Sequence, residues 1–135
     1  MEREALGIRV TTSLDFAEAE RRAREALAAE GFGILTEIDV AATMRAKLGV
    51  EMPAYKILGA CNPPLAHQAL LIWGGFGVLM PCNVVIQELG DRRLVTAFDP
   101  LGIAEVRDNA DILAIANEVQ ARLERALASV EQASN

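Results

Sequence analysis

The spacing of apolar and polar residues along the chain predicts alternating strands and helices. Apolar residues at every second position, or in short runs bounded by turn residues, predict strands at residues 5–11, 32–37, 54–60, 82–89 and 93–98. Apolar residues at helical spacing predict helices at residues 14–30, 40–48 and 64–73, and one more that starts at Asp108 or Asn109. The expected order is β-α-β-α-β-α-β-β-α, without an internal repeat.

Capping residues support these helix boundaries. Ser13, Asp39 and Asn62 each precede an expected helix, and each can accept a hydrogen bond from the first helical turn. Gly31 and Gly49 follow the first two helices, where glycine commonly ends a helix. The boundaries therefore rest on the ends of each helix as well as on its apolar spacing.

The last helix carries the clearest apolar stripe in the chain. Its members follow one another at spacings of four, three, four and four: Ile112, Ala116, Val119, Leu123 and Leu127. This stripe is too short, and too poor in flanking opposite charges, for a free-standing coiled coil. We therefore expect the helix to cover a sheet.

Residues 57–87 contain no Asp, Glu, Lys or Arg, although the rest of the chain is rich in charge. Both cysteines and the only histidine lie in this segment. Residues 74–77 are expected to form a glycine-rich loop, followed by a short extended stretch at residues 78–80. The apolar run at residues 69–82 is interrupted by glycine and proline and is shorter than the roughly 18 residues that span a bilayer. We expect it to be core or interface.

Length and charge narrow the class of protein. The 135 residues fit a single domain at residues 1–130 with a polar tail at residues 131–135 that frays. A net charge of -6 argues against nucleic-acid binding, because that affinity comes from clustered Lys and Arg. The charged start of the chain is not followed by the apolar core of a secretory signal, so a cytoplasmic protein without membrane contact is expected.

Two short sequences within the uncharged segment echo each other: Cys61-Asn62 and Cys82-Asn83. If the strands at residues 54–60 and 82–89 run antiparallel, the two cysteines lie at the same end of the sheet. The asparagines can satisfy backbone groups where strands end. The cysteines can be small core residues, or Cys61 can be a nucleophile whose thiol pKa is lowered by the helix that follows.

Metal and catalytic motifs are incomplete. Cys61, His67, Cys82 and Asp99 are possible ligands, but their spacing matches no standard zinc pattern, so no metal is expected. The sequence leaves the question of a cofactor open. Lys56 can hold an anionic ligand at a pocket mouth, or it can be an ordinary surface lysine. No complete catalytic constellation is present, so enzymatic activity stays open.

The sequences around the cysteines resemble the domain-of-unknown-function 302 family. The similarity is carried by residues 55–63, residues 79–85, residues 31–40 and Asp99-Pro100, and it covers nearly the whole chain. The resemblance implies an α+β fold similar to half of the TATA-binding protein, with a curved antiparallel sheet of about five strands backed by helices, and a homodimer. It implies neither DNA binding nor any catalytic residue.

Three hypotheses follow. The first is a cytoplasmic, homodimeric module that binds a small ligand or a partner, with a pocket at the two Cys-Asn sequences; its candidate site residues are Lys56, Cys61, Asn62, Cys82, Asn83 and Asp99. The second is a thiol-dependent enzyme or redox protein that uses Cys61, with Cys82 as resolving partner or second ligand and with His67 or Lys56 tuning the pKa of the Cys61 thiol. The third is a structural dimer whose interface is the uncharged segment.

Overall fold

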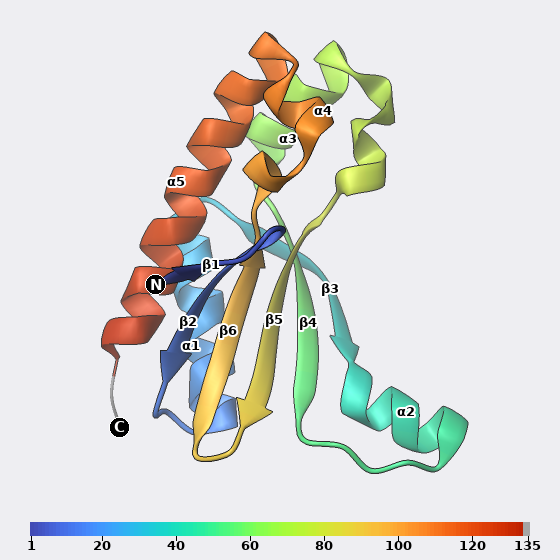
Figure 1. The fold of residues 1–135 in the computed structure, drawn as a ribbon, viewed down its shortest axis with the longest axis vertical. Helices are drawn as coiled ribbons and strands as arrows, with labels where there is room; N and C mark the ends of the chain where they lie inside the picture. Colours follow the sequence, from blue (N-terminus) through green and yellow to red (C-terminus); the bar gives the residue numbers. More distant parts are fainter. Residues whose placement is uncertain (134–135) are drawn as a thin grey trace.

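The computed structural model describes residues 1–133 as an antiparallel sheet with its long helices on one face (Figure 1). In these residues the sheet has six strands in the order β1-β2-β6-β5-β4-β3. The strands are β1 (Glu2–Arg3), β2 (Gly7–Thr12), β3 (Gly33–Asp39), β4 (Tyr55–Cys61), β5 (Cys82–Leu89) and β6 (Arg92–Phe98). The α+β class and the curved antiparallel sheet are confirmed, and β1 is added to the five strands that were expected.

The helices lie close to their expected positions. They are α1 (Phe16–Ala29), α2 (Val40–Leu48), α3 (Pro63–Ile72) and α5 (Ala110–Gln132), together with a short α4 (Ala104–Arg107) and two 3-10 helices, η1 (Gly74–Leu79) and η2 (Pro100–Gly102). Glu131 and Gln132, which were expected in a frayed tail, belong to α5. The last two residues of that tail, 134 and 135, lie outside the described residues.

Side-chain caps begin the main helices. Asp39 and Asn62 cap α2 and α3 as expected, and Asn109 caps α5. The expected cap of the first helix was wrong by two residues, because Asp15 and not Ser13 accepts the hydrogen bond from the amide of Glu18, at 2.9 Å. The helix therefore starts later than the apolar spacing indicated.

The main core lies between the sheet and the two long helices. Both α1 and α5 pack against the strands on one face, and against each other. Alternate strand residues are fully buried under them: Ile8, Val10, Leu58, Val84, Ile86 and Val95. On α5 the predicted stripe is buried at Ile112, Ala116, Leu123 and Leu127, and Val119 is partly buried. Among residues 1–133, no α-helix covers the opposite face of the sheet (Figure 1).

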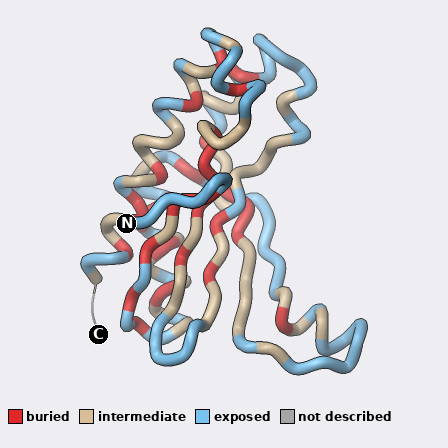
Figure 2. Tube along the Cα trace, in the orientation of Figure 1, coloured by how far each residue is buried: buried red, intermediate tan, exposed pale blue. Residues whose placement is uncertain are grey.

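A second, smaller cluster of buried residues lies beyond one end of the sheet, where α3, η1, α4 and the start of α5 meet (Figure 1). Its fully or nearly fully buried members are Ala69, Val106, Ile112 and Ala116. Helix α5 belongs to both clusters, since its C-terminal half packs on the sheet. Figure 2 shows buried residues at this end surrounded by exposed segments of α3 and η1.

The glycine-rich run differs from its expected form. Residues 74–79 form the 3-10 helix η1, where a loop and the start of an extended stretch were expected. The reason is tertiary packing, because Phe76 and Leu79 pack against the second cluster. The rings of Phe76 and Trp73 also meet edge to face, with their centroids 5.8 Å apart. A spacing rule that considers one segment at a time does not include these contacts.

Candidate functional site

The pairing of β4 with β5 brings the two cysteines to one end of the sheet. These strands are antiparallel, with Ala60 opposite Cys82 and Gly59 opposite Asn83. Cys61 is the last residue of β4 and Cys82 is the first residue of β5. Their shared location, expected from topology, is confirmed.

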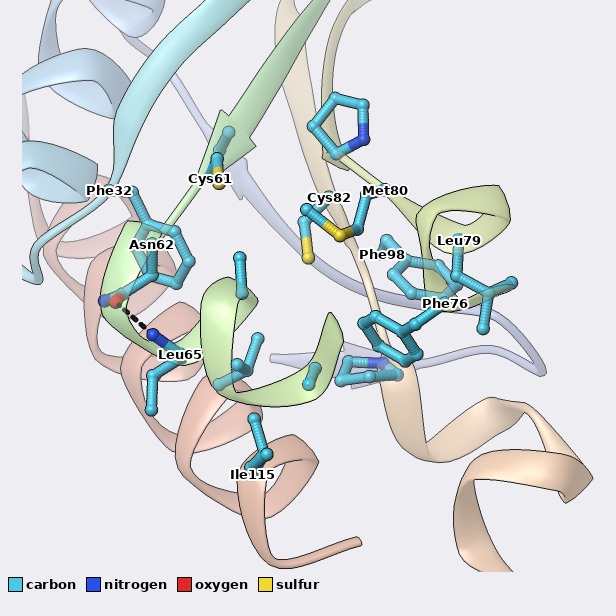
Figure 3. A pocket seen from close by; sticks show the side chains of 16 residues that line it. Phe32, Cys61, Asn62, Leu65, Phe76, Leu79, Met80, Cys82, Phe98 and Ile115 are labelled. Carbon is cyan, nitrogen blue, oxygen red and sulfur yellow. Dashed lines mark hydrogen bonds between the residues drawn. The ribbon is translucent and has the colours of Figure 1, made fainter. Parts of the chain in front are cut away.

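A small, partly enclosed cavity of about 40 Å³, called the internal cavity below, lies at this end between the strand ends and α3. Cys61 and Cys82 line it from the sheet, Leu79 and Met80 from the segment after α3, and Ile115 from α5. Figure 3 shows these side chains around α3. Apart from Asn62 and the sulfur-containing side chains, the lining residues are hydrocarbon, so the cavity offers few partners to water.

Both thiols have raised pKa values. Burial raises the pKa of Cys61, and burial together with the nearby charge of Cys61 raises the pKa of Cys82 to about 11. This direction is opposite to the lowered pKa that the position before a helix suggested. Asn62 stands between Cys61 and α3, and its side-chain oxygen accepts the hydrogen bond from the amide of Leu65 at 3.4 Å. Desolvation of the thiols is therefore the dominant effect.

The two asparagines occupy different environments. Asn62 is 6% exposed, and its side-chain nitrogen donates to the carbonyl of Glu30 at 3.4 Å. Arg122 on α5 donates to the same carbonyl at 3.0 Å. Asn62 thus joins the end of α1 to the start of α3, whereas Asn83 is exposed on the uncovered face of the sheet.

A cleft of about 370 Å³ is present on that uncovered face. Asn83, Val85 and Thr96 form part of it from β5 and β6, and Val78 contributes from η1. A wall made of Leu79, Met80, Pro81 and Phe98 lines both this cleft and the internal cavity. The two hollows therefore share a wall that consists of residues 79–81 and Phe98.

Gly59 allows this segment to approach the sheet. A Cβ atom at this position would lie 2.8 Å from Cγ of Pro81 and would also overlap the hydroxyl of Thr36 on β3. Only glycine leaves room for both neighbours without a shift. The close approach of Pro81 to β4 in turn shapes the end of the cleft.

Lys56 lies away from both hollows. It is near the start of β4, and its Nζ forms ion pairs with Glu20 at 2.8 Å and with Glu37 at 2.9 Å. Arg24 joins the same two carboxylates. The hydrogen bonds that its ammonium donates to Glu20 and Glu37 raise the pKa of Lys56. Its ammonium is thus engaged in a network between α1, β3 and β4.

Asp99 and His67 also lie outside the lining of the two hollows. Asp99 is 7% exposed, and its Oδ1 accepts hydrogen bonds from the amide of Leu101 and from Gln120 Nε2, both at 3.0 Å. His67 is exposed on α3. Among residues 1–133, no group of three His, Cys, Asp or Glu side chains is placed to hold a metal ion.

Three residues that line the hollows were not among the site residues expected from the sequence. Met80 lines both hollows, and Val85 and Thr96 line the cleft. The alternation of side chains between the two faces of a strand could have indicated Val85 and Thr96. Val84 and Val95 are buried under the helices, so Val85 and Thr96 must face the other side of the sheet. Met80 has no such signal, because its position depends on the fold of η1.

Comparison with solved structures shows the same fold in a related protein. The crystal structure of the uncharacterized conserved protein DUF302 from Bacillus stearothermophilus matches with a TM-score of 0.84 and 25% sequence identity, over 92% of this chain and 97% of that chain. No curated protein matches this chain at a significant level of similarity. No helix in residues 1–133 is long and apolar enough to cross a membrane.

The family comparison covers five of the six strands, lacking only β1 and the first residue of β2, and the two long helices almost completely. The model of the family described as Domain of unknown function DUF302 matches residues 8–130, which include both Cys-Asn sequences and almost all of α5. The chain therefore belongs to the family Domain of unknown function DUF302.

Proposed function

We propose that this domain binds a small, neutral and largely apolar molecule in the cleft beside Asn83. The observation that carries this proposal is the cleft itself, about 370 Å³ on the uncovered face of the sheet. Sites for small molecules usually measure about 300–1,000 Å³ and combine apolar walls with a few polar groups. The internal cavity, at about 40 Å³, is too small for such a ligand.

The chemistry of the lining suggests the ligand. Asn83 offers an amide that can donate and accept, and Thr96 offers a hydroxyl. The remaining lining residues are apolar: Leu6, Val78, Leu79, Met80, Pro81, Val85, Ala97 and Phe98. No lining residue is charged, and an unpaired charge is costly to bury. These facts favour a neutral ligand with one hydrogen-bonding end and an apolar body.

A thiol-dependent function is less well supported. The thiolate is the reactive form of cysteine, and raised pKa values leave little thiolate at neutral pH. Neither Lys56 nor His67 lies in the cavity lining, where either would have to act on a thiol.

Both cysteines are free, which suits a reducing compartment such as the cytoplasm, and cell fractionation would test that location.

We also propose that the chain forms a homodimer through α3 and η1. These elements expose large apolar side chains in one short stretch: Leu70 37%, Leu71 74%, Ile72 43%, Trp73 36% and Val78 89%. Contiguous apolar surface of this kind typically marks an interaction site. A second copy of the chain would remove it from water.

The ligand proposal predicts a cleft-specific loss of binding in the variant Val85→Arg, which places a charge among the apolar walls. The control is Gln87→Arg, on the same strand and the same face but outside the cleft. Neutral fragments that carry an amide or hydroxyl should shift the amide signals of Asn83 and Thr96 in two-dimensional NMR. These shifts should vanish with Val85→Arg and persist with Gln87→Arg. Shifts that survive Val85→Arg would contradict the proposal.

The thiol pKa values predict slow alkylation of the native protein at pH 7. Iodoacetamide should modify both cysteines more slowly than a free cysteine peptide, with Cys82 the slower. Because the pKa of Cys82 is about 11, its rate should rise about tenfold per pH unit from pH 7 to pH 10. Mass spectrometry at timed intervals measures each site, and the urea-unfolded chain is the control. A Cys61 that reacts faster than the peptide at pH 7 would restore the nucleophile hypothesis.

The dimer proposal predicts that Leu71→Glu converts the protein to a monomer. The matched control is Leu48→Glu on α2, where the original leucine is 68% exposed against 74% for Leu71. Sedimentation velocity at micromolar concentration should show a dimer for the unaltered chain and for Leu48→Glu. A monomeric unaltered chain, or a dimer that only Leu48→Glu dissociates, would exclude this interface.

A further inference from the structure

The internal cavity is much smaller than the cleft and takes a different kind of occupant. At about 40 Å³ it is far below the roughly 150 Å³ of an apolar cavity that holds benzene. A single water molecule would fit by volume, but it needs two or more polar partners. The lining supplies mainly carbon and sulfur atoms. An occupant should therefore be a single atom that prefers sulfur to water.

Three sulfur-containing side chains line this one cavity: Cys61, Met80 and Cys82. Their common location follows from the backbone. Cys61 ends β4 next to Ala60, which is paired directly with Cys82, and Met80 precedes Cys82 by two residues. Figure 3 shows the three side chains at the strand ends, with α3 across the cavity. Each sulfur comes from a different point of the chain: the strand pairing positions the two cysteines, and the fold of η1 positions Met80.

We propose that Cys61, Cys82 and Met80 form a binding site for a soft monovalent metal ion, copper(I). Thiolate and thioether sulfur are the ligands that select copper(I) among the common metals. Zinc prefers four ligands, and no His, Asp or Glu residue lines the cavity to provide the fourth. Apolar lining residues such as Phe76, Leu79 and Ile115 offer the ion no competing oxygen or nitrogen ligand.

The binding step changes protonation and leaves the oxidation state unchanged. Two copper–sulfur bonds form with the thiolates of Cys61 and Cys82, and their two protons pass to solvent. The thioether of Met80 donates a lone pair without losing a proton. Copper remains in the +1 state, so no oxidant or reductant takes part. The metal proposal does not rest on the ligand proposal, although Met80 and Pro81 line both hollows.

The test is an anaerobic titration of the reduced, full-length protein with copper(I) against a chromophoric copper(I) chelator. We expect one copper per chain. Loss of a group that only supports a metal ligand weakens metal binding about 10–100-fold. Loss of a ligand itself should weaken binding at least as much, so Cys61→Ser and Cys82→Ser should each weaken copper binding about 100-fold or more. Met80→Leu should weaken binding about tenfold. Met52→Leu, outside the cavity lining, is the control and should bind as tightly as the unaltered protein.

X-ray absorption at the copper edge provides a second readout, because it should detect only sulfur neighbours in the unaltered protein and one fewer in Met80→Leu. Circular dichroism checks that each variant folds. If Cys82→Ser does not fold, Met80→Leu decides, since this exchange nearly conserves side-chain volume. Any one of four results would overturn the proposal. These are the absence of tight copper(I) binding, tighter binding of zinc than of copper(I), nitrogen or oxygen neighbours at the copper, and equal copper affinity in Met80→Leu and Met52→Leu.

Discussion

The antiparallel register of β4 and β5 is the constraint on which both hollows depend. It places Leu58 opposite Val84 in the core and Ala60 opposite Cys82 at the strand ends. A slip of one residue would turn Leu58 and Val84 out of the core, so burial of these side chains holds the register. The same register puts Cys82 beside the internal cavity and Asn83 on the uncovered face. Core packing thus determines which neighbouring residue serves which hollow.

Helix α5 connects that sheet to the elements that cover its end. Leu123 and Leu127 pack in the main core, whereas Ile112 and Ala116 belong to the smaller cluster with Ala69 of α3. The internal cavity lies where the two clusters meet, whereas the cleft lies on the uncovered face of the sheet. The cluster on the sheet is large and covered on one side by two long helices, but α3 buries only one residue fully. We infer that α3 and η1 open more easily than the strands beneath them.

Local signals were enough to predict much of the fold. Helix α2 has the expected bounds because Asp39 caps it and Gly49 ends it in a left-handed conformation. Strand β5 also has its expected bounds, between Pro81 and the turn at Gly90. The topology of two such strands was enough to bring Cys61 and Cys82 together. These features depend on residues that are close in sequence, or on a single pairing.

The rest of the site depends on contacts between distant segments. Met80 reaches the cysteines only because η1 folds onto the second cluster. The pKa of Cys61 reflects burial by surrounding elements, which its sequence position before a helix does not reveal. Lys56 was considered as a ligand residue because it borders the uncharged segment, yet Glu20, thirty-six residues earlier, holds its ammonium. The sequence therefore located the region but not the chemistry of its walls.

Hydrogen–deuterium exchange of the monomeric variant Leu71→Glu, in which no second copy covers α3, tests the central claim most directly, namely that the β4–β5 pair forms a rigid sheet end under a separately opening cover of α3 and η1. Amides of residues 65–79 should exchange through local opening, with a free energy well below that of global unfolding. Amides of Leu58, Val84 and Ile86 should exchange only when the whole domain unfolds. Equal protection of both groups, with the same dependence on denaturant, would contradict this account.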